Sequence, residues 1–404
     1  MVSNGPGRIN QAFSVRSSTW PKSQIRADWA YLVESDLDGR PFSHDERALV
    51  YARAKGDNSS HPFGTELDVY GREYKWLAHS IAPSREAQGC TRVAVGTDQC
   101  SRPYLAARLN ISAMSFGSLG GRAIEALNLG AKIGGFYHDT GEGGLSDHHL
   151  KHGGHVVWEI GSGYFGCRDR EGRFDPLAFR DAARRDEVVM TEIKLSQGAK
   201  PGYGGFLPAA KVTDEIATVR DVPAGQDCAS PAYHTAFSTP IELVEFAKPV
   251  IRLAASGKVN SGASIAMNAA LGADWCNAAR AFMFALGCVQ SLRCHTDTCP
   301  TGVATQSPAR QRGLVVEDKA ARVARFQKAT LNALHDIVVA CGLESPDEFS
   351  PDNFRQRISA MEMRTMDEVY HFVAAGEMID GARDERLAKW WKQADAASFS
   401  RRAF

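Results

Sequence analysis

Short apolar runs that end in glycine-rich turns alternate with helix-like stretches through the middle of the chain. The runs begin LNISAMSFG, GFYHDTGEGG, VVWEIGSGYFG, VVMTEIKLSQ, VIRLAASGK and DWCNAARAF. Apolar strands that alternate with amphipathic helices are typical of parallel βα units. The pattern therefore predicts an α/β region of about six recognisable βα units over residues 108–305.

The segments before this region have a different pattern. Residues 1–25 are polar and predict a flexible tail, and residues 26–107 are irregular and predict a covering segment. Within the covering segment, residues 44–54 have helical character, and the preceding Ser43 is a suitable N-cap.

The segment after the βα region predicts a helical extension over residues 306–404. Between residues 317 and 341 the apolar side chains recur at helical spacing, which indicates a helix packed on one face. The last sixty residues are also expected to be helical and peripheral.

Composition and charge narrow the class of protein. The chain has 404 residues, of which 47 are basic and 47 acidic, so its charge gives no reason to expect nucleic acid or an anionic membrane as partner. It contains no apolar stretch of signal-peptide or membrane-span type. Nine cysteines, an odd number, do not suggest a secreted disulfide framework. We expect a cytoplasmic protein that acts on small molecules.

Three cysteines lie close together in the run GCVQSLRCHTDTCPTGVATQ, at Cys288, Cys294 and Cys299. Three thiolates suffice for an iron-sulfur cubane that lacks one iron corner, and Pro300 keeps the loop from continuing into a helix. Two alternatives remain open at this stage. The thiols could bind zinc with His295 as a fourth ligand, or they could be unrelated core residues.

Glycine clusters follow several of the predicted strands, as in TGEGG and GYGG. Glycines let backbone N–H groups approach a ligand, although each cluster alone could be a tight turn. In a (β/α) barrel such loops share one face, and the last two units commonly bind phosphate. The residues expected to form that phosphate site are Ser256, Gly257, Lys258, Ala279 and Arg280.

Several motifs in one order give the chain a family resemblance. The segments ISAMSFGSL, HDTGEGG, QGAKPGYGG with LPAAKV, ASPAYHTAFSTP and CVQSLRCHTDTCPTGVATQ resemble the FMN-binding synthase domain of glutamate synthases over residues 25–370. The chain is most similar to stand-alone members without an amidotransferase domain. The resemblance implies a TIM-type (β/α)8 barrel that carries FMN and a 3Fe-4S cluster.

In this family, electrons pass through the cluster to FMN, which reduces a 2-imino acid formed from 2-oxoglutarate and ammonia. The implied partners are these small molecules, together with a ferredoxin or an NAD(P)H-dependent subunit as electron donor.

The resemblance also implies roles for particular residues. Glu142, Lys200 and Arg220 would face the oxo acid, and Lys194 and Gln197 would reach the flavin edge. Arg220 could instead be a solvated helix residue, Lys194 could pair with Glu192, and Glu142 could only cap a turn. The loop expected to line the flavin with backbone groups consists of Ala113, Met114, Ser115, Phe116 and Gly117; below it is called the flavin loop.

One departure from the family concerns the substrate. The family reads GEGGQLP where this chain reads GYGGFLP, with Tyr203 and Phe206. Losing an amide that would bond a carboxylate weakens the prediction of 2-oxoglutarate. Another oxo acid, or a transferase that makes N-substituted glutamate, stays open.

A second departure concerns the barrel itself. The family has two further strands between the helix IELVEFA and the strand VIRLAASGK, and here Ala247-Lys248-Pro249 joins them directly. At thirty or more residues per unit, roughly 60 to 80 residues are missing. Since strand number, tilt and shear are coupled, six strands cannot close this barrel. We expect the strands at Glu192 to Leu195 and Val250 to Ala254 either to have unpaired edges or to be forced together under strain, and we expect impaired flavin binding. The alternative function is a cluster-binding paralogue or subunit with little activity.

Overall fold

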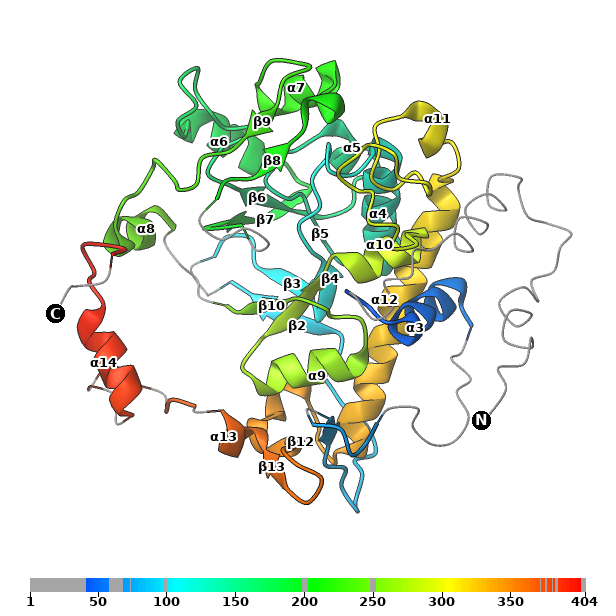
Figure 1. Cartoon of the computed structure of the whole chain (residues 1–404), viewed down its shortest axis with the longest axis vertical. Coiled ribbons are helices and arrows are strands. Elements are labelled where there is room, and N and C mark those ends of the chain that lie inside the picture. Colours follow the sequence, from blue (N-terminus) through cyan, green and yellow to red (C-terminus); the bar gives the residue numbers. More distant parts are fainter. Residues whose placement is uncertain are drawn as a thin grey trace, which may run out of the picture.

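A six-stranded, all-parallel sheet forms the centre of the computed structural model (Figure 1). The structure describes residues 41–57, 68–72, 74–96, 100–197, 203–247, 252–370, 372–374, 376–379, 381 and 384–400. The strand order is β10-β11-β4-β5-β6-β7. The strands are β4 (Leu109–Ile111), β5 (His138–Asp139), β6 (Val156–Ile160), β7 (Val188–Ile193), β10 (Ala254–Ser256) and β11 (Trp275–Ala278).

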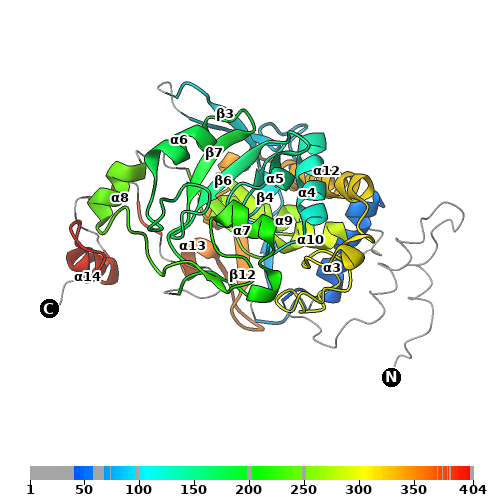
Figure 2. The ribbon, with the colours of Figure 1, turned by 90° about the horizontal axis from the view of Figure 1, so that it is seen from above.

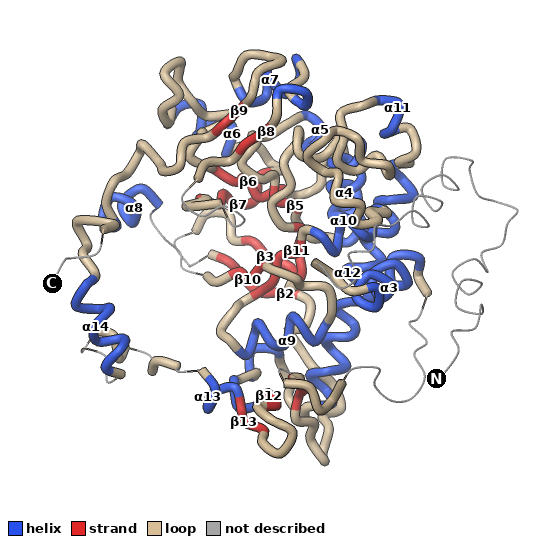
Figure 3. The backbone as a smooth tube through the Cα atoms, in the orientation of Figure 1, coloured by secondary structure: helices blue, strands red, loops and turns tan. Residues whose placement is uncertain are grey.

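Each strand lies in one of the six apolar runs, so the prediction of six βα units is confirmed. The sheet curls like part of a TIM-type barrel (Figure 3). Among the described residues nothing pairs with the outer sides of β7 and β10, and the α/β barrel is therefore incomplete.

Helices cover the outside of the sheet near its middle strands. The long helix α12 (Val316–Ala340) packs against α4 (Gly121–Gly134), α3 (His44–Lys55), α9 (Gly262–Ala270) and α10 (Arg280–Leu286). The helices predicted around residues 44–54 and 317–341 are both confirmed as α3 and α12. Ser43 caps α3 as expected, because its side chain accepts from the backbone N–H of Glu46.

The loops above the sheet contain short elements that position side chains. They are α5 (Asp147–Leu150), α6 (Pro176–Ala183), η1 (Ala209–Lys211), α7 (Asp214–Arg220), α8 (Pro240–Ala247), α11 (Pro308–Gln311) and an antiparallel pair, β8 (Phe206–Leu207) with β9 (Cys228–Ala229).

The covering segment and the C-terminal region share a small antiparallel sheet. Its strands are β1 (Lys75–Leu77), β12 (Phe354–Arg357) and β13 (Met363–Thr365), in the order β1-β12-β13. A purely helical C-terminal extension is therefore wrong for residues 354–365, because β1 offers this segment a pairing edge from distant sequence.

The remaining peripheral elements lie around this core. They are the antiparallel pair β2 (Arg92–Val95) and β3 (Tyr104–Ala107), η2 (Pro346–Glu348), η3 (Pro351–Asn353), α13 (Met366–Val369) and α14 (Glu385–Gln393). Figure 2 shows α8 and α14 at the side of the molecule opposite α3 and α12. In the part of the chain that the structure describes, no helix combines the length and apolar character needed to cross a membrane.

Candidate functional site

The loops after β4 and β5 meet at the carboxyl edge of the sheet. The backbone N–H of Met114 in the flavin loop donates to the carbonyl of Asp139 at 3.3 Å. Met114 and Phe116 are buried, and the ring of Phe116 lies 4.6 Å from that of His148. Gly143 is needed here, since a Cβ at this position would lie 2.7 Å from both Ser115 and Arg220. The flavin loop is therefore closely packed, and the missing side chain of Gly143 leaves room for Arg220 and Ser115.

Arg220 is buried beside the flavin loop rather than solvated. It ends α7, and its side chain crosses to donate from Nη2 to the carbonyl of Phe116 at 3.1 Å. Its guanidinium stacks over the ring of Phe165 at 5.2 Å, and Nη1 lies 3.8 Å from the thiol of Cys228. Its Nε is buried and has no hydrogen-bond partner among the described residues. The alternative of a solvated helix residue is therefore wrong.

Arg220 lines a small hollow whose remaining wall is mixed in character. Glu142 and Ser230 contribute polar atoms, and Phe165 and Phe206 contribute apolar ones. A buried guanidinium with a spare donor is a suitable partner for one carboxylate.

Glu142, Lys194 and Gln197 form one connected group. The Gln197 amide donates to both carboxylate oxygens of Glu142, at 2.9 and 2.8 Å. The Lys194 ammonium lies 3.6 Å from Glu142 and 3.4 Å from Glu159. Burial lowers the pKa of Lys194, but the charges of Glu159 and Glu142 outweigh this and raise it overall. Lys194 thus forms ion pairs with Glu142 and Glu159 and not, as the alternative held, with Glu192.

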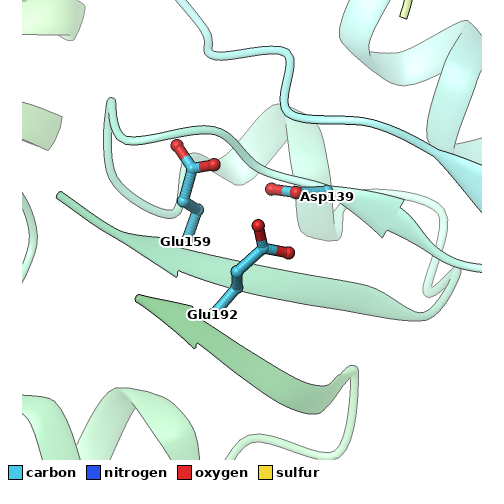
Figure 4. A group of neighbouring side chains, drawn as sticks. All are labelled: Asp139, Glu159 and Glu192. Carbon is cyan, nitrogen blue, oxygen red and sulfur yellow. The ribbon is translucent and has the colours of Figure 1, made fainter. Parts of the chain in front are cut away.

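Three carboxyl groups from neighbouring strands converge (Figure 4), and one of them, Glu159, forms the ion pair with Lys194. Asp139, Glu159 and Glu192 end β5 or lie within β6 and β7, and one oxygen of each lies within 4.8 Å of the others. Burial, followed by the opposing effects of Lys194 and its acidic neighbours, raises the pKa of Glu159 to about 7. Burial also raises the pKa of Asp139 well above its usual value, and that of Glu192 is raised although this residue is exposed on its edge strand. Burial and mutual repulsion thus make it unfavourable for all three carboxyls to be ionised together.

The sequence analysis did not single out this group of three carboxyls. A signal was present, because Glu159 and Glu192 each interrupt an otherwise apolar strand, in VVWEI and VVMTEI. An acidic residue inside such a run must find partners within the fold.

The cysteine loop, residues 287–306, follows α10 and brings its three thiols near one another. The charges of Cys294 and Cys299 act on Cys288, whose pKa is raised to about 12, chiefly by burial. Burial and Cys299 raise the pKa of Cys294, whereas the charges of Lys211 and Arg280 lower it. The loop is thus neighboured by cations that favour thiolates.

The group that these thiols bind stays a prediction. A single zinc ion would draw tetrahedral sulfur ligands to within about 3.8 Å of one another, whereas separate irons of one cluster hold thiolates further apart. Among the described residues, the cysteines do not form a group whose ligand atoms all lie within 4.8 Å.

The residues predicted to bind phosphate lie in two places. Ser256, Gly257 and Lys258 are exposed at the end of the edge strand β10, and the Ser256 hydroxyl lies 3.4 Å from that of Ser112. Ala279 and Arg280 begin α10, where Arg280 also acts on the cysteine loop. Their phosphate role stays a prediction.

The remaining residues of the predicted site are Lys200, Tyr203 and Phe206. Lys200 lies outside the described residues. Phe206 and Tyr203 are 57% and 72% exposed, so neither is fixed by packing. The sequence reasoning missed one buried cation, Lys211, although it stands in the quoted motif LPAAKV.

Comparison with known proteins gives a consistent family. The model of a conserved region in glutamate synthase matches residues 81–250 and 245–344. The chain is 32% identical to the glutamate synthase large subunit-like protein YerD of Bacillus subtilis, over 69% of this chain and 68% of that protein. It is 28% identical to the archaeal glutamate synthase [NADPH] of Methanocaldococcus jannaschii, over 66% of this chain and 65% of that protein.

The chain thus spans about two thirds of the length of these relatives. Among solved structures, mandelate oxidase with (S)-2-phenylpropionate matches at 11% identity and a TM-score of 0.36, over 86% of this chain and 99% of that one. A likeness this slight bears on no functional argument.

Each alignment with these two relatives is longer than the part of this chain that it covers. The Bacillus alignment runs over 359 positions but takes up 69% of 404 residues, about 279, which leaves about 80 positions with no counterpart here. The Methanocaldococcus alignment runs over 345 positions and takes up 66%, about 267 residues, which leaves about 78.

Proposed function

Because the chain belongs to the glutamate synthase family, we propose that it is a glutamate synthase-type oxidoreductase that carries FMN and a 3Fe-4S cluster. In this proposal it reduces an imine formed from an oxo acid and ammonia. The observation that supports it best is that the flavin loop, buried Arg220 and the cysteine loop lie together at one edge of the sheet.

The residues present fit both prosthetic groups. The flavin loop would hold FMN through backbone groups, with Gly143 leaving room for Arg220 beside the loop, and Ser256 to Lys258 would bind its phosphate. Cys288, Cys294 and Cys299 would ligate the cluster. Bound FMN would supply hydride chemistry, and the protein would supply orientation and charge.

The chain's own residues would bind and orient the substrate. Arg220 would hold one carboxylate through its spare Nε at the hollow that it lines. Glu142 is held by Gln197 and Lys194, so its carboxylate is fixed where it could accept an N–H of the imine or amine.

The composition of the hollow favours an oxo acid other than 2-oxoglutarate. Arg220 is its cation among the described lining residues, and Phe206 replaces the family's glutamine. A second carboxylate would have to rely on Lys200. Ammonia and methylamine tested side by side with 2-oxoglutarate and an apolar oxo acid would show which pair is used, and methylamine preference would indicate the transferase alternative.

The electron donor would be a ferredoxin or an NAD(P)H-dependent partner. Some relatives carry NADPH in their names, which supports a nicotinamide-dependent route. The test is a visible spectrum of anaerobically purified protein with FMN, iron and sulfide quantified, followed by amine-dependent oxidation of a reduced donor. Protein that lacks iron after reconstitution, or that contains stoichiometric zinc instead, would refute the proposal.

A second candidate function is favoured by the open sheet. Strands β7 and β10 have unpaired edges among the described residues, and about 80 positions of the relatives have no counterpart. On this basis the chain would bind the cluster but hold FMN weakly, as a paralogue or subunit. Titration with FMN decides between the two, because tight stoichiometric flavin excludes the second and full iron without flavin favours it.

A further inference from the structure

A buried lysine joins the flavin loop region to the cysteine loop. Lys211 ends η1 and is 2% exposed. Its Nζ donates to the carbonyl of Ser118 at 2.7 Å and to the carbonyl of Cys294 at 3.2 Å. Ser118 directly follows the flavin loop, and Cys294 is the middle thiol of the cysteine loop. One ammonium therefore bonds both segments.

The charges near this ammonium come mainly from the cysteine loop. Burial is the largest effect and lowers the pKa of Lys211 overall, Arg220 lowers it further, and Asp297, Cys294 and Cys299 act in the opposite direction. Asp297 is the carboxylate among these groups, and the two carbonyl partners are neutral. Ionised ligands in that loop would make the balance more favourable.

A second, uncharged tie connects the same segments. The amide of Gln306 donates from Nε2 to the carbonyls of Gly117 and Leu119, each at 3.0 Å. Because Gln306 carries no charge, it fixes the loops without affecting their electrostatics. Lys211 thus supplies both a connection between the loops and a positive charge, whereas Gln306 supplies a connection alone.

We propose that Lys211 is a positioning residue that holds the flavin loop against the cysteine loop and supplies the buried positive charge that favours the reduced cluster. The inference rests on the proposed function, since it requires the cluster. A one-electron reduction by the donor protein adds one negative charge to the cluster while the donor is oxidised. A fixed ammonium beside the loop stabilises that added charge.

The test measures the cluster midpoint potential in the full-length holoprotein by a redox titration followed by electron paramagnetic resonance. In Lys211→Met the equilibrium for reduction should weaken about tenfold, which lowers a one-electron potential by about 59 mV. Lys211→Arg keeps the charge and should stay near the wild-type potential. Gln306→Leu should slow electron transfer to flavin without shifting the potential.

Lys132→Met is the matched control, because Lys132 also donates to a backbone carbonyl, that of His152 at 2.7 Å, but is exposed. A Lys211→Met potential equal to that of the Lys132→Met protein would overturn the inference. If Lys211→Met fails to retain iron, Lys211→Gln keeps an N–H donor without charge, and a wild-type potential in that variant would overturn it equally. Wild-type protein without iron would instead refute the proposed function itself.

Discussion

Two strands of nearly the same composition have opposite environments in this molecule. Strand β6 reads VVWEI and is buried at every residue. Strand β7 reads VVMTEI, yet Thr191 and Glu192 are exposed. The difference lies in their neighbours, because β6 is paired on both sides whereas β7 is at the sheet edge (Figure 1). Apolar sequence makes a strand suitable for burial, but only a second neighbour buries it.

The other edge of the sheet repeats this contrast. Strand β11 is buried throughout, whereas Ala254 and Ser256 of its neighbour β10 are exposed. Apolar side chains near both edges are exposed as well, with Leu195 at 52% and Leu253 at 58%. Apolar side chains are thus exposed next to both open edges. This is expected of an incomplete barrel, because its end strands lack a second neighbour.

The largest predicted effect is on the free energy of unfolding, for a buried leucine compared with an exposed one. Leu109 on β4 is fully buried, and Leu109→Ala should lower the free energy of unfolding by about 2–5 kcal/mol. Leu253→Ala, the same change at an exposed position beside β10, should cost about 0.5 kcal/mol or less. Urea unfolding measures both. Equal losses would mean that the open side is packed in solution.

Completing the barrel should increase flavin affinity. Inserting the segment of the Bacillus relative that aligns with the gap, at the junction of residues 247 and 248, should tighten FMN binding about 100-fold, or about 2.7 kcal/mol. A glycine-serine insert of equal length is the control, since it adds chain without strands. Fluorescence titration with FMN measures the difference, and equal affinity for both proteins would show that the gap does not limit flavin binding.

The three neighbouring carboxyls of Asp139, Glu159 and Glu192 should make the free energy of unfolding depend on pH. The pKa of Glu159 is raised from its usual 4.5 to about 7, so the folded protein binds a proton that the unfolded chain has released. This stabilisation is complete below about pH 4.5 and is lost as pH rises through about 7. Between these limits, Glu159→Gln should reduce the loss of free energy of unfolding by about 1–3 kcal/mol. Unfolding midpoints across the range measure it, with Glu171→Gln as a surface control, and an unchanged slope would contradict it.

The smallest effect concerns association through the exposed edges. Leu195→Lys and Leu253→Lys should change the free energy of unfolding by less than about 0.5 kcal/mol. They should nevertheless reduce self-association, because charged residues discourage edge-to-edge pairing. Sedimentation velocity at several concentrations measures this, and Ile133→Lys on α4, 58% exposed on a helix that packs against the middle strands β4 and β5, is the control.

Much of the fold could be predicted from local patterns. The six apolar runs gave six strands, and Ser43 marked the start of α3, because an N-cap side chain bonds a backbone N–H close by in sequence. The strands β12 and β13 were missed, since their pairing with β1 joins segments far apart in sequence. No local pattern carries that information.

The candidate site divides in the same way. The flavin loop, Arg220 and Glu142 were predicted as site residues from motifs, but the burial of Arg220 against Phe165 depends on where α7 ends. The partners of Lys194 also came only from the fold, because Glu142 and Glu159 approach it from two other strands and loops.

By itself the sequence determined the family, the βα alternation and the three thiols, because each is written in residue types at short spacing. Only the tertiary structure decided that a lysine links two loops, that three carboxyls share one space and that two strands stand unpaired. These features arise from contacts between distant segments, and burial, charge and pairing are properties of such contacts rather than of any segment alone.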